Sequence, residues 1–179
     1  FPTRRSSDLT TVDGTGGGTL PAAMDGIFDQ IGAVVVVVRV EPGADEAETL
    51  ANVVGGVNGA TGQFEGAHAL LGAESVVGHA PRILCAPGWT HQRPGDLANP
   101  VVAELEGIAG RMGAVIVADG PNTTDAAAVA YAGDWGTSGR VYVIDPWVKV
   151  QNRAGDIVDE PASARVAGVI ARTDNDEGF

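Results

Sequence analysis

Runs of apolar, β-branched residues separated by glycine and proline dominate the pattern of this chain. Residues 33–40 contain six valines, with Arg39 as the single charged position, and are apolar at consecutive rather than alternate positions. This pattern is typical of a strand buried on both faces inside a parallel sheet that helices cover. Shorter runs at residues 81–86, 114–118 and 141–144 end close to glycine or proline and predict three more strands. We therefore predict a sheet with residues 33–40 at its centre.

Between these runs, apolar residues recur at the three- and four-residue spacing of amphipathic helices. Pro21 stands at the first turn of one predicted helix, which begins near residue 20. Asp45 and Glu48 have the spacing of a capping box and predict a helix over about residues 47–55. Asn99, followed by proline, is the expected cap of another helix, which extends to about residue 112.

Three more helices are predicted at residues 67–77, 124–131 and 161–172. The last of them is expected to bury four apolar side chains: Ala162, Val166, Val169 and Ile170. Because strands and helices alternate along the chain, we predict an α/β fold with a mainly parallel sheet flanked by helices. A length of 179 residues favours one domain.

The acidic balance of the chain limits its partners. It has 23 Asp and Glu residues against 11 Lys and Arg residues, a formal net charge of -12. No basic patch is available for phosphates, so nucleic acid is not an expected partner. The longest apolar run, residues 31–38, is less than half as long as a membrane-spanning helix, so no membrane insertion is expected. Cys85 is the single cysteine, which excludes an intrachain disulfide and fits a reducing cytoplasm.

The two ends of the chain predict a fragment. Residues 1–9 (FPTRRSSDL) look like a translated sequencing adapter and are set aside as a cloning scar would be; a short basic arm is the alternative. Residues 10–179 begin without methionine and stop just after a predicted helix. They are expected to form a core domain that lacks N- and C-terminal parts.

Polar residues follow the strand at residues 114–118. Asp119 stands at its carboxyl end, the usual place for ligand groups in open α/β sheets. Because Gly120 and Pro121 follow it, its carboxylate is instead expected to bond the amides of the turn. Asn122, together with one of the two threonines after it, is expected to cap the next helix.

The strand at residues 141–144 breaks at Asp145-Pro146 and continues as residues 148–150. Trp147, between these two parts, is expected to act as a packing or interface anchor, with a stacking platform for a sugar or base as the alternative. Whether Trp147 and Lys149 pack within the subunit or face a neighbour is left open by the sequence.

No catalytic, cofactor-binding or metal-binding set is predicted. The glycine-rich residues 13–18 lack the Gly-Lys-Ser/Thr sequence of a phosphate loop and the preceding strand of a dinucleotide-binding fingerprint, so a surface loop is expected. The three histidines lack the spacing of a zinc site. No Gly-x-Ser-x-Gly motif is present. Apolar neighbours favour an inert Cys85 thiol, although a Cys-His pairing across the fold stays open.

Several blocks, in order, closely resemble the contractile tail sheath proteins of P2-like bacteriophages. They are residues 19–22 (TLPA), 25–30 (DGIFDQ), 34–39, 82–88 (RILCAPG), 119–124 (DGPNTT), 140–150 (RVYVIDPWVKV) and 160–173. The resemblance implies a subtilisin-like α/β core domain, but no Ser-His-Asp set carries over.

The same resemblance implies a structural subunit and not an enzyme. Copies would form a helical homo-oligomer around the tail tube protein, with baseplate and tail terminator proteins as further partners. Such a subunit would be found in the virion, and in the host cytoplasm during assembly. Two alternatives stay open: the sheath of a phage-derived bacteriocin or injection device, and a small α/β hydrolase or nucleotide-binding enzyme that uses Asp119 and Asp145.

Overall fold

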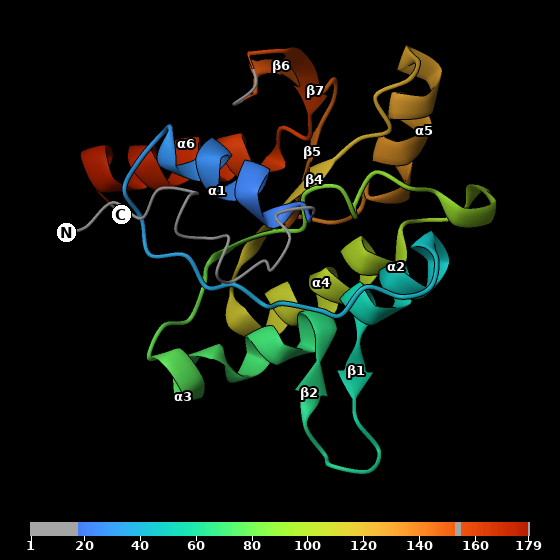
Figure 1. The fold of residues 1–179 in the computed structure, drawn as a ribbon, viewed down its shortest axis with the longest axis vertical. Coiled ribbons are helices and arrows are strands. Elements are labelled where there is room, and N and C mark those ends of the chain that lie inside the picture. Colours follow the sequence, from blue (N-terminus) through green and yellow to red (C-terminus); the bar gives the residue numbers. More distant parts are fainter. Residues whose placement is uncertain (1–17, 153–154, 179) are drawn as a thin grey trace.

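A computed structural model describes residues 18–152 and 155–178 of the chain; the predicted adapter and the glycine-rich loop of residues 13–17 lie outside them. The described part is a three-layer arrangement in which a parallel sheet lies between two groups of helices (Figure 1). Helices α1 (Leu20–Phe28) and α6 (Ser163–Glu177) pack against each other on one side of the sheet. Helices α2 (Glu46–Val54) and α4 (Pro100–Met112) lie on the other. The predicted α/β class is confirmed.

The sheet contains three parallel strands in the order β3 (Ile83–Cys85), β4 (Val115–Asp119) and β5 (Val141–Ile144). Val117 of β4 pairs with Cys85 on one side and with Tyr142 on the other. Helix α4 connects β3 to β4, and α5 (Asp125–Asp134) connects β4 to β5. Strand β4 is therefore the central strand, and four of its five residues are buried.

Side-chain caps fix the starts of three helices at the predicted positions. Asn99 accepts hydrogen bonds from the amides of the first turn of α4, at 2.9 and 3.0 Å. Asp45 caps α2 by accepting from the Glu48 amide at 2.8 Å, and Thr124 caps α5 by accepting from the Ala127 amide at 3.2 Å. Because these bonds satisfy amides that a helix start leaves unpaired, local sequence alone determines where these helices begin.

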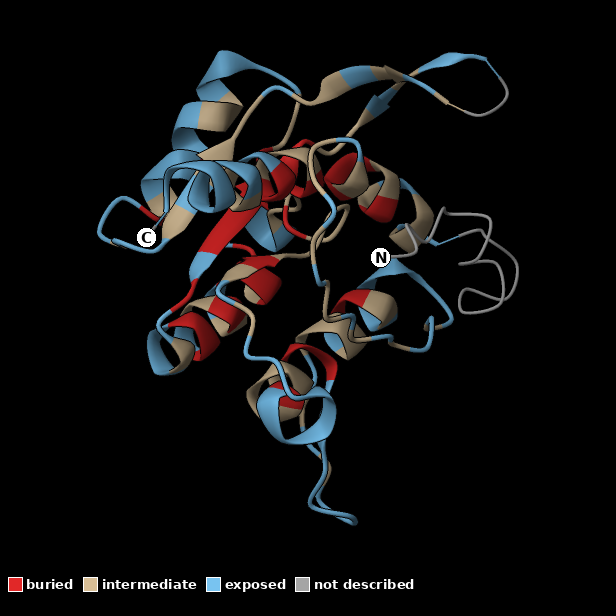
Figure 2. Cartoon of the chain, turned by 90° about the vertical axis from the view of Figure 1, so that its left-hand side faces the viewer, coloured by how far each residue is buried: buried red, intermediate tan, exposed pale blue. Residues whose placement is uncertain are grey.

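The larger core lies between the sheet and α4. Helix α4 contributes a fully apolar face, and Ile116 and Ala118 contribute one face of β4. Tyr131 and Trp135, from α5 and its end, close this core, with their rings 6.3 Å apart. Figure 2 shows the buried residues gathered in the centre of the molecule.

The opposite face of the sheet is covered by α6, whose buried side chains are small. Ala164, Ala167 and Gly168 are buried, whereas Val169 is 37% exposed. Of the four side chains expected to be buried, Ala162 is buried, Val166 and Ile170 are only partly buried, and the prediction is wrong for Val169. Helix α1 approaches α6 closely at one point: a Cβ on Gly168 would lie 2.8 Å from the Ile27 carbonyl oxygen, so this position has no room for a side chain.

Residues 33–40 do not form the central strand, and this prediction is wrong. They are irregular, contribute to no sheet among the described residues, and leave Val34 69% and Val37 42% exposed. A run of β-branched residues reports strand propensity, but a strand also needs a partner whose backbone groups it can pair with.

Three further segments differ from the sequence expectation. Residues 66–77 form a 3-10 helix, η2 (Gly66–Gly72), followed by α3 (Ala73–Val77), and not one continuous helix. The loop before them contains a two-residue ladder of β1 (Gly56–Val57) with β2 (Phe64–Glu65). The loop after β3 contains the short η3 (Pro94–Asp96).

After the Asp145-Pro146 break the chain does not continue strand β5. Instead, β6 (Val148–Gln151) pairs antiparallel with β7 (Ile157–Glu160). This hairpin lies at the edge of the molecule, apart from the three-stranded sheet (Figures 1 and 2). The sequence expectation of a single broken strand therefore missed β7.

We expect Gly168→Ala to lower the free energy of unfolding by about 1–3 kcal/mol, because the new methyl group overlaps the backbone of α1. The matched control is Gly107→Ala in α4, where a Cβ meets nothing within 4 Å. The control should raise stability by about 0.5–1 kcal/mol through helix propensity. Urea unfolding of both variants measures the difference; equal effects of the two substitutions would contradict the close packing of α1 on α6.

Candidate functional site

The carboxylate of Asp119 lies at the carboxyl end of β4 and is fully buried. Its Oδ1 accepts a hydrogen bond from the Ser163 amide at 2.8 Å, and its Oδ2 accepts one from the Ser163 hydroxyl at 2.6 Å. Ser163 is the first residue of α6, and the N-cap residue Ala162 has no side chain that can cap the helix. Asp119 therefore caps α6 from the central strand, at the helix end where a negative charge is stabilised.

Thr90 extends this network to the loop after β3. Its Oγ1 accepts from the Asp119 amide at 2.9 Å and lies 3.4 Å from Asp119 Oδ2. The Thr90 carbonyl oxygen accepts a hydrogen bond from the Tyr131 hydroxyl at 2.6 Å. One buried network thus connects the β3 loop, β4, α5 and α6.

Burial controls the charges of this network. Loss of solvent raises the pKa of Asp119, and the hydrogen bonds from Ser163 and Thr90, together with the nearby His91, oppose this rise only in part. Burial likewise raises the pKa of Tyr131 above its usual value. Burial, with a smaller contribution from the charge of Asp119, raises the pKa of the Cys85 thiol to about 12. The thiol is therefore protonated at neutral pH, which is the opposite of an activated nucleophile.

A second cluster joins the turn after β4 to the turn after β5. Asp145 Oδ2 accepts from the Asn122 amide at 3.0 Å, and Asn122 Oδ1 accepts from the Trp147 amide at 3.1 Å. The indole Nε1 of Trp147 donates to the Gly120 carbonyl oxygen at 3.0 Å. A Cβ on Gly120 would lie 2.5 Å from Asp145 Oδ2, so the two turns approach too closely for any residue but glycine. The Asp145-Pro146 peptide bond in this corner is cis.

These contacts correct the sequence expectation for two residues. Asp119 bonds the start of α6 instead of the amides of its own turn; the turn amide of Asn122 is bonded by Asp145 instead. Asn122 does not cap α5, because Thr124 does. With φ at 53°, Asn122 occupies a left-handed conformation that asparagine tolerates better than most residues. In this position its side chain points to the Trp147 backbone.

His91 interacts electrostatically with Asp119, so the three side-chain types of a Ser-His-Asp triad occur in this region. The His91 ring packs edge-on against Trp147, with centroids 5.0 Å apart, and its buried Nδ1 has no hydrogen-bond partner among the described residues. Burial lowers the pKa of His91. Ser163 is fully buried and donates directly to the carboxylate without an intervening imidazole. This arrangement gives no activated and accessible serine.

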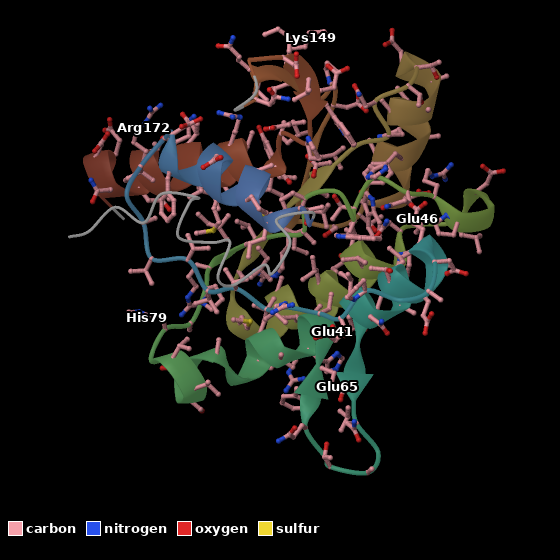
Figure 3. All side chains as sticks on the ribbon, in the orientation of Figure 1. Glu41, Glu46, Glu65, His79, Lys149 and Arg172 are labelled. Atoms are coloured by element: carbon pink, nitrogen blue, oxygen red, sulfur yellow. The ribbon has the colours of Figure 1, made fainter. Side chains whose placement is uncertain are left out.

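Lys149 lies away from both clusters, on the β6–β7 hairpin at the edge of the molecule (Figure 3). Its Nζ pairs with Asp159 Oδ1 at 2.8 Å across the hairpin, and the Lys149 side chain is 73% exposed. An exposed ion pair of this kind adds little stability, so Lys149 stays available to other partners.

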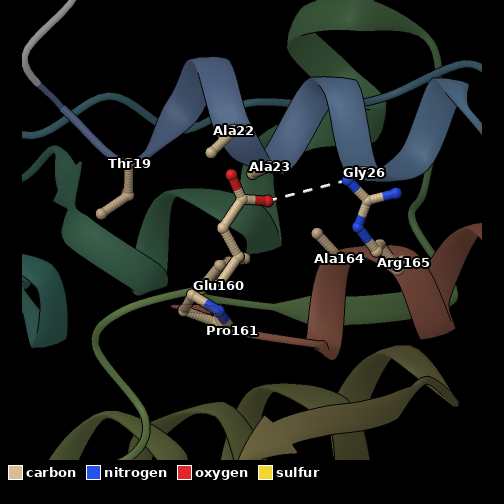
Figure 4. Close-up of a pocket in the computed structure, with 9 residues that line it drawn as sticks. Thr19, Ala22, Ala23, Gly26, Glu160, Pro161, Ala164 and Arg165 are labelled. Atoms are coloured by element: carbon tan, nitrogen blue, oxygen red, sulfur yellow. Dashed lines mark ion pairs between the residues drawn. The ribbon is translucent and has the colours of Figure 1, made fainter. Parts of the chain in front are cut away.

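A small pocket of about 80 Å³ lies between α1 and α6 (Figure 4). Ala22, Ala23, Gly26 and Ala164 line it, and Glu160 and Arg165 lie 3.7 Å apart at its edge. It is far smaller than a typical site for a cofactor or drug-sized ligand. Within residues 18–152 and 155–178, no three His, Cys, Asp or Glu side chains are placed to hold a metal ion. The helices of this same part are too short or too polar to cross a membrane.

Sequence reasoning missed Thr90, Tyr131 and Ser163 as partners of this network. Ser163 follows Pro161 and Ala162 at a predicted helix start, and the absence of a capping side chain there was the available signal that an acceptor must come from elsewhere. No local pattern marks Thr90, because its partner is 29 residues away along the chain.

The site is thus a set of buried contacts that close an α/β domain, as in a structural protein. Residues 62–179 match the central domain of phage tail sheath proteins. The chain belongs to the phage tail sheath family.

Individual relatives carry the same description. Over 164 residues the chain is 38% identical to a prophage major tail sheath protein of Pseudomonas aeruginosa, covering 91% of this chain and 40% of that protein. It is 33% identical to the tail sheath protein of Burkholderia phage BcepMu, covering 97% of this chain and 40% of the relative. Over 76 residues it is 49% identical to the tail sheath protein of Escherichia phage P2, covering 40% of this chain and 19% of the relative. The chain therefore spans about two fifths of the length of the first two relatives.

Replacing Asp119 with Asn is expected to change how stability depends on pH. The folded pKa of Asp119 is raised, so the stability it contributes is fully present below its unfolded pKa of about 3.9 and is lost as the pH rises through the folded value. Relative to Asp119→Asn, the unsubstituted chain should therefore become less stable from about pH 4 towards neutral pH. Urea unfolding at a series of pH values measures this; an unsubstituted chain that became more stable relative to Asp119→Asn as the pH rose would contradict it.

Asp119→Ala should lower the free energy of unfolding by about 3 kcal/mol, because the buried amide and hydroxyl of Ser163 lose their acceptor. The matched control is Asp159→Ala, which removes only the exposed pair with Lys149 and should cost about 0–1 kcal/mol. Denaturant unfolding at neutral pH compares the two variants. Similar losses would show that the buried cap contributes no more than a surface ion pair.

Proposed function

We propose that this chain is part of a subunit that polymerises into a contractile phage tail sheath around the tail tube and contracts to drive the tube through the host envelope. Membership of the phage tail sheath family is the observation that carries the proposal. The relatives in Pseudomonas aeruginosa and in phages BcepMu and P2 are named as tail sheath proteins. The partners of the complete subunit would be further copies of itself, the tube, the baseplate and the tail terminator. It would act in the virion after assembly in the host cytoplasm.

The geometry of the domain supports a structural rather than catalytic role. A subunit that bears force through repeated contacts needs elements that do not separate. Asp119 holds α6 to the central strand, and Asn122, Asp145 and Trp147 hold two turns together. The carboxylates that an enzyme hypothesis would use are occupied by these contacts, and Asp119 is buried.

We further propose that residues 10–179 correspond to the core of the subunit, with residues 1–9 foreign to it. Within this core, Asp119, Asn122, Asp145 and Trp147 would form a rigid corner. Lys149, exposed on the β6–β7 hairpin, would face a neighbouring subunit or the tube. The acidic character of the chain, with a net charge of -12, fits pairing with a lysine-bearing neighbour.

The complete gene product that contains this sequence, expressed alone, is expected to form tubes seen by negative-stain electron microscopy. Lys149→Glu should weaken assembly if the hairpin faces an acidic neighbour, while leaving thermal unfolding of the unassembled subunit nearly unchanged, because the lost ion pair is exposed. Lys149→Arg is the charge-matched control. A protein that stays monomeric and turns over a small substrate would contradict the proposal.

A further inference from the structure

The valine-rich segment at residues 33–38 has the composition of a strand but no strand partner. Its ends are fixed to the body of the domain: the Ile31 amide donates to the Ile27 carbonyl oxygen at 3.1 Å, and Asn52 Nδ2 donates to the Glu41 carbonyl oxygen at 3.0 Å. Between these anchors, the backbone of residues 33–38 makes no hydrogen bond with any described residue. In Figure 1 it belongs to the pale-blue segment that connects α1 to α2 without forming a helix or strand.

The side chains of this segment are divided between two environments. Val35, Val36 and Val38 are half-buried against the domain, whereas Val34 is 69% and Val37 is 42% exposed. The segment therefore rests on the domain by part of its apolar surface and presents the rest, together with unpaired amides and carbonyls, to the outside. These are the features of an edge that accepts another strand.

We infer that residues 33–38 are a strand of the complete sheath subunit and pair with an extended segment of the same polypeptide. Most of the length of the Pseudomonas aeruginosa and BcepMu relatives lies outside the region matched here, so the complete subunit contains much more chain than the described domain. The region matched by the BcepMu relative covers 97% of this chain and therefore spans residues 33–38.

We assign the strand partner to the same chain, and not to a second copy, because an uncovered edge would make the free subunit aggregate. An exposed valine run with free backbone groups is a template for edge-to-edge aggregation. A subunit that forms ordered tubes instead of irregular aggregates needs this edge covered within the monomer. Family membership, and not the proposed contraction, carries this inference.

Hydrogen exchange read by mass spectrometry on the complete, unassembled subunit tests the inference. Amides 34–38 should exchange at least about 100-fold more slowly than the exposed loop amides of residues 79 and 80. Amides 116–118 of the central strand serve as the protected reference. Fast exchange of residues 34–38 in the dilute subunit would overturn the inference. If these amides then became protected on assembly, the strand partner would be a second copy; if they stayed unprotected, the segment would have no strand partner.

Two valines with matched exposure provide an independent test. Val34 is 69% exposed and Val129, on α5, is 73% exposed. In the complete subunit, Val34→Lys should lower Tm by at least about 3 °C, or prevent accumulation of soluble protein, because its position is covered. Val129→Lys should leave Tm within about 1 °C, as expected for a surface change. Equal Tm values for the two variants would overturn the inference and leave the sheath assignment intact, since tube formation is measured separately.

Discussion

The burial of one carboxylate at the end of the central strand is the constraint on which the rest of this domain depends. Asp119 can stay buried only because three donors, from Ser163 and Thr90, surround it. In return, it supplies the cap that the start of α6 lacks. If α6 or the β3 loop shifted, the carboxylate would lose its hydrogen-bond donors and remain buried without partners. It therefore fixes α6, the β3 loop and, through Tyr131, α5 relative to the sheet.

The position of α6 then determines what can lie outside it. Because α6 is held against the sheet, α1 must pack on a helix that cannot move away, and the contact has room only for Gly26, Ala164 and Gly168. Arg165 crosses this contact to pair with Asp29 at 2.8 Å. Small residues on this face are thus a consequence of the buried cap and not of a binding site. The elements of this domain are thus joined by buried polar contacts as well as by apolar packing.

Local signals predicted most elements of the fold. Asn99, Asp45 and Thr124 specify helix starts through side chains that bond amides two or three residues away, and such bonds need nothing else from the protein. The short apolar runs around β3, β4 and β5 also became strands, because each has a neighbouring strand whose backbone it pairs with. Residues 33–40 show the limit of this reasoning: they have the highest strand propensity in the chain, yet propensity does not supply a partner. Strand β7 was missed for the opposite reason, since its four residues carry two acidic side chains and little apolar signal.

For this protein, the sequence by itself determined the α/β class, the starts of α2, α4 and α5, and the resemblance to tail sheath proteins, since each depends on neighbouring residues or on ordered blocks. Only the tertiary structure decided what Asp119 does. Its partners are 29 and 44 residues away along the chain, and they meet it because parallel strands place their carboxyl ends at one edge of the sheet. The same holds for Asn122 and Trp147, which are separated by 25 residues. A side chain whose partners come from distant elements carries no local pattern, because its role is defined by the fold that brings those elements together.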